Sequence, residues 1–172
     1  RLVLPDRLKS DLLECVQSLR ASERPPGHPD GMDMEKQLHQ LLEAPNFFET
    51  VLANIPAMVV VLSLDGRIVV FNRTCEEVSG FTSAEVLGRL ISEVFLLPEE
   101  IRGLQEVYEK LKQGRFPIHH QNAWLTKDGR TRQIYWSNAV ALYAASGEIV
   151  FVVGMGQDIT EEVNRRDEMR EL

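Results

Sequence analysis

The sequence predicts an α+β fold: a five-stranded antiparallel sheet that carries short helices on one face, with an N-terminal helical extension and a C-terminal exit helix. Two β-branched runs, MVVVL and RIVVF, flank the turn sequence SLDG and predict a hairpin. Helix-capping signatures follow this hairpin. Three longer strand-like stretches, separated by turns, come after these helices. Two strands, then helices, then three strands indicate one sheet with its helices on one side.

The first part of the chain is predicted to be helical outside the sheet. Residues 1–23 carry leucines at helical spacing, typical of an amphipathic helix. Residues 24–33 include RPPGHPDG, and its prolines and glycines cannot continue a helix, so this stretch is predicted to be a linker.

Residues 34–55 form a second predicted helical segment that flanks the sheet domain. Pro45 interrupts its apolar series, and Asn46 with Glu49 resembles a capping box, so we expect a fresh helix over 47–54. The series has the four-and-three spacing of a helix that packs on a partner helix, so it is a candidate homodimer interface. The alternative is that these helices cover the flank of the following domain. The candidate interface residues are Leu38, Leu41, Phe48 and Leu52.

The sheet domain is predicted to span residues 56–158. Asp65-Gly66 marks the turn of its first hairpin. Asn72 can cap a short helix that ends at Gly80, and Thr82 with Glu85 forms a second capping box.

The second half of this domain is predicted to hold one longer helix and a three-stranded meander. The helix follows Pro98, and Gly114 can end it. The strands are expected over 116–125, 130–142 and 149–157, and a charged connector helix over 159–172 follows them.

Three sequence segments give this order a family resemblance. FNRTCEEVSGFTSAEVLGR, TKDGR and the closing GQDITEE resemble a PAS domain with its C-terminal motif, over residues 46–162. The resemblance implies a sheet around a small pocket, with a signal leaving through the flanking helices to a covalently linked output domain. The stretch NAWLTKDGRTRQIYWSN is similar to PAS domains of bacterial sensor histidine kinases, as in two-component systems, and of diguanylate cyclases.

Composition excludes several other classes of function. The net charge is -7 and the basic residues are spread along the chain, which argues against nucleic acid as a partner. Apolar runs are only strand-sized and no signal peptide is visible, so we expect a cytoplasmic domain without membrane contact. No hydrolase, metalloprotease or nucleotide-binding motif is present, so a regulatory binding domain is favoured over an enzyme.

The residues that a cofactor would need also narrow the choice of ligand. Gly88-Arg89 is followed by Leu90 and Ile91, so the thiol of cysteinyl-flavin photoreceptors is missing there. The helix over 99–112 has no histidine for a haem iron. His119 and His120 are adjacent on a strand and point to opposite faces, so they cannot share a metal. A non-covalent flavin or a small metabolite stays open, as does a ligand-free dimerisation or scaffold module.

Two groups of residues are the predicted functional positions. Strand alternation places polar and aromatic side chains on the inward face of the sheet, where they line either a ligand pocket or only the core. Asp158 and Thr160 hold the family's junction motif, where a side-chain oxygen can cap the exit helix and relay strand movement, or cap it without any switching. The pocket candidates are Asn72, Asn122, Trp124, Trp136, Asn138 and Met155.

Overall fold

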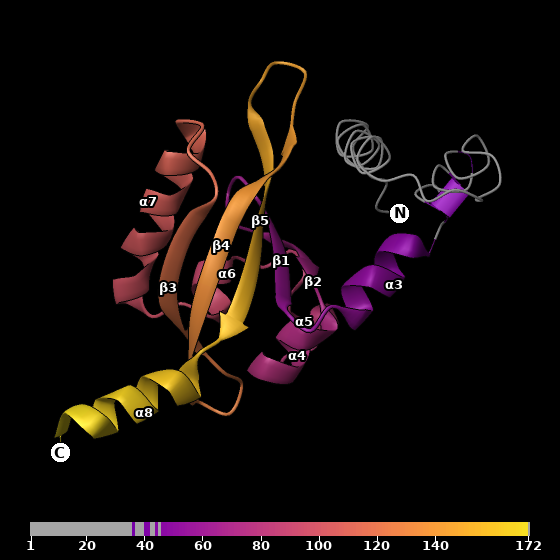
Figure 1. The fold of residues 1–172 in the computed structure, drawn as a ribbon. Helices are drawn as coiled ribbons and strands as arrows, with labels where there is room; N and C mark the ends of the chain where they lie inside the picture. Colours follow the sequence, from indigo (N-terminus) through magenta and orange to yellow (C-terminus); the bar gives the residue numbers. More distant parts are fainter. Residues whose placement is uncertain (1–35, 37–39, 42–43, 45, 172) are drawn as a thin grey trace, which may run out of the picture. The chain divides into compact units, whose positions relative to one another are not determined.

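The computed structural model of the chain describes residue 36, residues 40–41, residue 44 and residues 46–171. The chain divides into two units between Val51 and Leu52, and the second unit holds the sheet (Figure 1). The predicted helix over 1–23, the linker over 24–33 and the interface candidate Leu38 lie outside the described residues. The fresh helix expected over 47–54 is confirmed, because helix α3 spans Phe47–Asn54.

The predicted five-stranded antiparallel sheet is confirmed. Its strands lie in the order β2-β1-β5-β4-β3, so the last strand in sequence lies between the first and the fourth. Asp65-Gly66 closes the β1–β2 hairpin, with Gly66 at a φ of 87° that favours glycine. The strands are β1 (Met58–Ser63), β2 (Ile68–Phe71), β3 (Ile118–Leu125), β4 (Thr131–Tyr143) and β5 (Ile149–Asp158).

Two of the helices between β2 and β3, α4 and α5, begin at the capping residues that the sequence indicates. Asn72 accepts a hydrogen bond from the Cys75 amide at the start of α4, and Gly80 ends this helix. Thr82 and Glu85 form the expected capping box of α5. The elements are α4 (Arg73–Ser79), α5 (Ser83–Val86), α6 (Ile91–Val94), the 3-10 helix η1 (Pro98–Glu100) and α7 (Ile101–Lys112).

These helices cover one face of the sheet, and the core lies between the two layers. Buried Cys75, Val86 and Ile91 from the helices pack in one cluster with Val60 and Ile134 from the strands. Aromatic rings run through this cluster, with centroid separations of 5.5 Å, 4.2 Å and 5.1 Å along the series Phe71, Phe95, Trp124 and Trp136.

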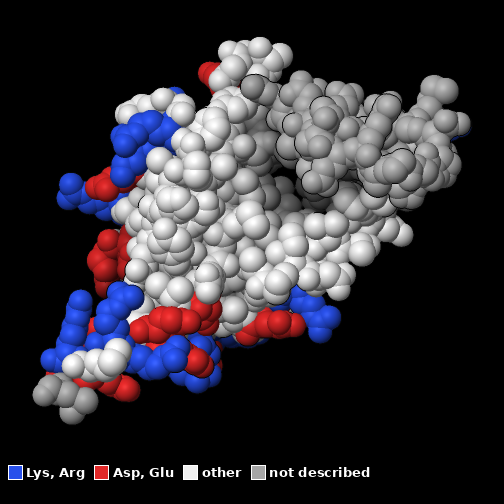
Figure 2. All heavy atoms as spheres, in the orientation of Figure 1, with Lys and Arg blue, Asp and Glu red and all other residues white. Residues whose placement is uncertain are grey.

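Among the described residues, the opposite face of the sheet is uncharged over its centre (Figure 2). Figure 2 shows charges gathered over α8 and around the rim, with an uncharged surface over the viewed face of the sheet. Tyr135 on β4 and Met155 on β5 are exposed there, by 43% and 48%. The prediction that Met155 lines the pocket is therefore wrong.

A β-bulge in β5 explains this error. Tyr143 pairs with Ile149, but the next pair joins Leu142 to Phe151, so β5 contains an extra residue at this point. Strict alternation from the buried Ile149 would turn Met155 inward. The bulge reverses the phase, and Val152, Gly154 and Gly156 face the core instead.

The exit helix α8 spans Thr160–Glu171 and begins directly after β5. None of its residues is buried, in agreement with its charged sequence. Among the described residues, no helix is both long enough and apolar enough to cross a lipid bilayer.

Candidate ligand cavity and helix junction

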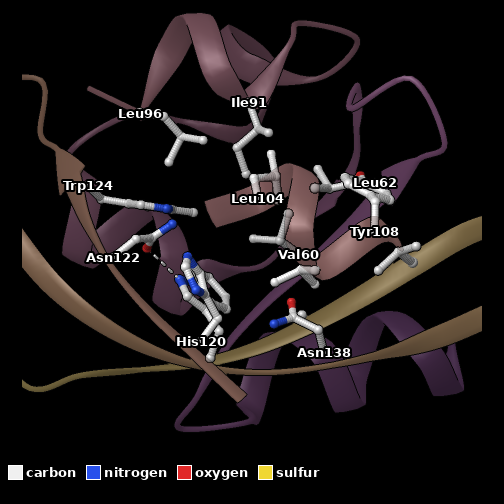
Figure 3. A pocket seen from close by; sticks show the side chains of 14 residues that line it. Val60, Leu62, Ile91, Leu96, Leu104, Tyr108, His120, Asn122, Trp124 and Asn138 are labelled. Carbon is white, nitrogen blue, oxygen red and sulfur yellow. Dashed lines mark hydrogen bonds between the residues drawn. The ribbon is translucent and has the colours of Figure 1, made fainter. Parts of the chain in front are cut away.

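A small cavity lies between the inward face of the sheet and helices α6 and α7 (Figure 3). Its volume open to the centres of water molecules is about 40 Å³. A buried water needs about 10–15 Å³ by this measure, so the cavity has room for about three waters or a small organic group. Its walls are mostly aliphatic, and they include Val60 and Leu62 of β1, Leu104 and Val107 of α7, and Val152 of β5.

Four of the six predicted pocket residues meet at this cavity. Asn122 and Trp124 come from β3, and Trp136 and Asn138 come from the neighbouring β4. The Trp136 indole Nε1 donates a hydrogen bond of 2.9 Å to the Asn122 Oδ1, so the two side chains fix each other's orientation. Asn138 Nδ2 donates to the Ile118 carbonyl over 3.1 Å, which fixes the amide at the other end of the cavity.

Glycines on β5 make room for these side chains. Gly154 is paired with Asn138, and Gly156 is paired with Trp136. A Cβ atom at Gly156 would lie 2.6 Å from the Trp136 ring and 2.9 Å from Ile134 Cγ2. The Trp136 indole therefore packs against the backbone of β5 and forms one wall of the cavity.

His120 also lines the cavity, on the same face of β3 as Asn122 and Trp124. Burial lowers the pKa of His120 below its usual value, although Glu100 and Glu106 act in the opposite direction and Lys110 in the same one. Gly103 on α7 gives the ring its space, because a Cβ atom there would lie 2.6 Å from His120 Cε1. Strand alternation could place His120 on this face, but it could not predict the contact with Gly103.

Asn72 is not a pocket residue, which corrects the prediction. Its Oδ1 accepts hydrogen bonds from the amides of Val59 and Cys75, and its Nδ2 donates to the carbonyls of Leu52 and Ala57. All of its hydrogen-bonding capacity is thus used to join α4 to β1 and to the segment before β1.

The segment Asp158–Thr160, which we call the junction, links α8 to the sheet. Thr160 Oγ1 accepts a hydrogen bond of 2.9 Å from the Gln133 amide of β4 and donates to Asp158 Oδ1. The Ile159 amide donates to the Gln133 carbonyl over 2.8 Å. Arg132 Nη1 lies 3.6 Å from Asp158 Oδ2. Both predicted relay residues therefore bind β4 at the start of the exit helix.

The cavity and its surroundings limit which cofactors could bind. In the described part of the chain, no group of three or more His, Cys, Asp or Glu residues could hold a metal ion. A flavin ring system does not fit the cavity as it stands, because space for about three waters is far too small for it. The thiol of Cys75 lies in the core, where burial raises its pKa to about 12.

The described interface candidates lie before the sheet. Leu41 is 47% exposed, and Leu52 is half-buried. Phe48 lies in α3, but its side chain is outside the described set.

The comparisons with known proteins agree on one fold. A family model described as PAS fold matches residues 52–164. The PAS domain of a protein from Colwellia psychrerythraea is 18% identical, with a TM-score of 0.60 over 66% of this chain and 95% of that chain. The PAS domain of an HTR-like protein from Haloarcula marismortui is 22% identical, with a TM-score of 0.54 over 73% and 99%.

A third similar structure contains a ligand. It is the PAS domain of the Cronobacter turicensis quorum-sensing receptor RpfR in complex with BDSF. It is 25% identical to this chain, with a TM-score of 0.53 over 63% of this chain and 98% of that chain. No curated protein matches the chain.

Proposed function

Because the chain belongs to the PAS fold family of sensory domains, we propose that it senses a small ligand in its cavity and relays the change through its flanking helices to an output domain. The RpfR domain supports the first half of this proposal, since a similar chain was solved with BDSF. The similarity of residues 122–138 to PAS domains of histidine kinases and diguanylate cyclases supports a linked cytoplasmic output of that kind.

One observation carries the proposal. The peptide groups of Gln133 hold both Ile159 and Thr160 at the start of α8. The same strand, β4, supplies Trp136 and Asn138 to the cavity. A change in the cavity that moves β4 therefore also moves the anchor of the exit helix.

This relay predicts that a cavity change alters α8 in large part through the Thr160 hydroxyl. Trp136→Phe removes the indole hydrogen bond to Asn122 inside the cavity. We expect this variant to shift the backbone amide resonances of residues 160–171 in NMR spectra. Thr160→Val removes the hydroxyl that binds the Gln133 amide at nearly constant volume. In that background, we expect the shifts caused by Trp136→Phe to fall by at least about half.

Thr131→Val is the matched control for Thr160→Val in this pair of experiments. Thr131 is exposed on β4, and its side chain forms no hydrogen bond with the described residues. The response of α8 to Trp136→Phe should persist in that background. Equal shifts with and without the Thr160 hydroxyl, or no shift of α8 at all, would refute the relay.

The exposed leucine before α3 supports a second role, the pairing of two copies. Leu41 is 47% exposed and belongs to the apolar series over 34–55. We expect Leu41→Glu to halve the mass measured by light scattering, because a carboxylate would be buried in a helical interface. Leu64→Glu is the control, since Leu64 is 45% exposed on the β1–β2 turn. An unchanged dimer in Leu41→Glu, or a monomeric parent chain, would contradict the interface.

The alternative function, a ligand-free dimerisation or scaffold module, makes different predictions for the two experiments. It retains the effect of Leu41→Glu on mass. It predicts no response of α8 to a change in the cavity.

A further inference from the structure

The ring of His120 on β3 packs against the backbone of α7. Among the described residues, His120 Nε2 is the one buried side-chain nitrogen or oxygen without a hydrogen-bond partner. A Cβ atom at Gly103 of α7 would lie 2.6 Å from His120 Cε1 and 3.0 Å from Nε2, so any larger residue there would displace the ring. The helix surface thus has a gap at Gly103, and the edge of the imidazole fills it.

This gap favours the neutral imidazole. In the charged form both ring nitrogens carry a proton, and Nε2 would hold its proton against the helix without an acceptor. A buried charge without a partner costs far more free energy than a buried neutral group. Burial accordingly lowers the pKa of His120 below its ordinary value of 6.5.

The charged groups that act on the ring belong to the helical layer. Glu100 of η1 and Glu106 of α7 favour the protonated form, and Lys110 of α7 opposes it, whereas the cross-strand partner on β4 is uncharged. Glu100 stays beside β3, because its Oε1 accepts a hydrogen bond of 3.1 Å from the Ala123 amide. Glu106 is exposed, and His120 as a whole is only half-buried. An imidazolium that left the gap would therefore meet carboxylates near the surface.

The two halves of α7 are attached to the sheet in different ways. The second half contains both buried residues of the helix, and the Tyr108 hydroxyl there donates a hydrogen bond of 3.3 Å to the Ser63 carbonyl of β1. The first half has no buried residue, and it holds Gly103 against His120. A change at His120 therefore acts on the first half of α7.

We propose that the contact between His120 and Gly103 makes the attachment of α7 to the sheet dependent on pH. The neutral ring fills the gap and holds the first half of α7 in place. The protonated ring leaves the gap toward the carboxylates of Glu100 and Glu106, and this half of the helix loosens. Leu104 lines the cavity from the same half, so loosening widens the cavity. This last consequence rests on the proposed sensing function, whereas the response of α7 to pH needs no ligand.

The direction of the pH effect follows from the lowered pKa. When α7 loosens, the pKa of His120 returns toward 6.5, so the loosened state takes up a proton more readily than the packed state. The stabilisation by the neutral ring is therefore complete above pH 6.5 and is lost as the pH falls toward the lowered pKa.

Amide hydrogen exchange followed by NMR measures the attachment of α7. The amides of residues 105–108 bind the carbonyls of the first helical turn and report on this half of the helix. We expect their protection factors, corrected for the intrinsic effect of pH on exchange, to fall at least about threefold between pH 7.5 and pH 5.5. In the same samples, the ring resonances of His120 should titrate below pH 6.5.

Variants of His120 test whether this side chain causes the pH dependence. His120→Phe keeps an aromatic ring at the gap but cannot take up a proton, so the pH dependence at residues 105–108 should disappear. His120→Gln does not titrate either, and it should give the same result even if the phenyl ring disturbs the packing. His119→Gln is the matched control, because His119 is the exposed neighbour on the other face of β3. The pH dependence should persist in that variant.

Gly103→Ala separates packing from titration. Alanine favours a helix over glycine by about 1 kcal/mol, so helix propensity alone predicts higher protection of α7. Because the added Cβ displaces the His120 ring, we expect lower protection at pH 7.5 and little further loss at pH 5.5. Gln105→Ala, on the exposed surface of α7, is the control and should leave the pH dependence intact.

The outcomes separate this inference from the sensing function. Equal protection of residues 105–108 at the two pH values, titration of His120 at or above pH 6.5, or higher protection in Gly103→Ala would each overturn the inference. The relay from Trp136 to α8 is tested at constant pH by Thr160→Val, so its failure would leave the response of α7 to pH intact.

Discussion

Replacement of Asn72 with alanine is expected to lower the free energy of unfolding by about 3 kcal/mol or more. The side chain is 5% exposed and makes four hydrogen bonds to backbone groups. Loss of the α4 cap alone costs about 1 kcal/mol. Most of the expected loss of stability comes from three other backbone groups that would lose their hydrogen-bond partner: the Val59 amide and the carbonyls of Leu52 and Ala57. Water does not readily replace a lost partner at a buried site. Urea denaturation followed by circular dichroism measures the loss.

Asn164→Ala is the matched control for Asn72→Ala. Asn164 lies on the exposed surface of α8, and alanine has a higher helix propensity than asparagine. We expect a change within about 0.5 kcal/mol. A loss below about 1 kcal/mol in Asn72→Ala would mean that water or a neighbouring group satisfies the three freed backbone groups, which would contradict the structural role assigned to this residue.

Gly156→Val is expected to destabilise the domain by about 2–3 kcal/mol, although valine usually favours a strand over glycine. The reason is the 2.6 Å approach of a Cβ atom to the Trp136 ring. The ring cannot retreat without losing its 2.9 Å hydrogen bond to Asn122, so the substitution also disturbs the cavity. Urea denaturation measures stability, and tryptophan fluorescence reports the displaced indole.

Two further variants isolate the steric cause. Gln157→Val lies next to Gly156 on β5 but is exposed, so it should change stability by no more than about 0.5 kcal/mol. In a Trp136→Phe background, the smaller ring should reduce the cost of Gly156→Val by about 1 kcal/mol. An undiminished cost in that background would show that the indole is not the cause.

Local signals in the sequence were sufficient for most of the fold. The Asp65-Gly66 turn, the Asn72 cap and the Thr82 capping box each depend on a few neighbouring residues, and all three occur as expected. The positions of Trp136 and Asn138 also followed from strand alternation, because β4 is regular between them.

The errors concern features that arise only when distant segments meet. The β5 bulge depends on pairing with β4, and it moved Met155 to the exposed face. Asn72 was placed correctly as a cap, but its other partners lie 13 to 20 residues earlier in the chain. The pairing of Gly103 with His120 joins a helix to a strand, and no pattern in either segment predicts it.

The attachment of α8 to β4 gives the exit helix the mechanics of a lever. The helix has 12 residues, so at 1.5 Å per residue it extends about 18 Å from its anchor. The amide of Gln133 binds the Thr160 hydroxyl, and its carbonyl binds the Ile159 amide. A change in the twist of β4 therefore changes the direction of α8. A tilt of about 10° at Thr160 displaces the far end by about 3 Å, which converts a sub-ångström adjustment beside the cavity into a motion the size of a side chain.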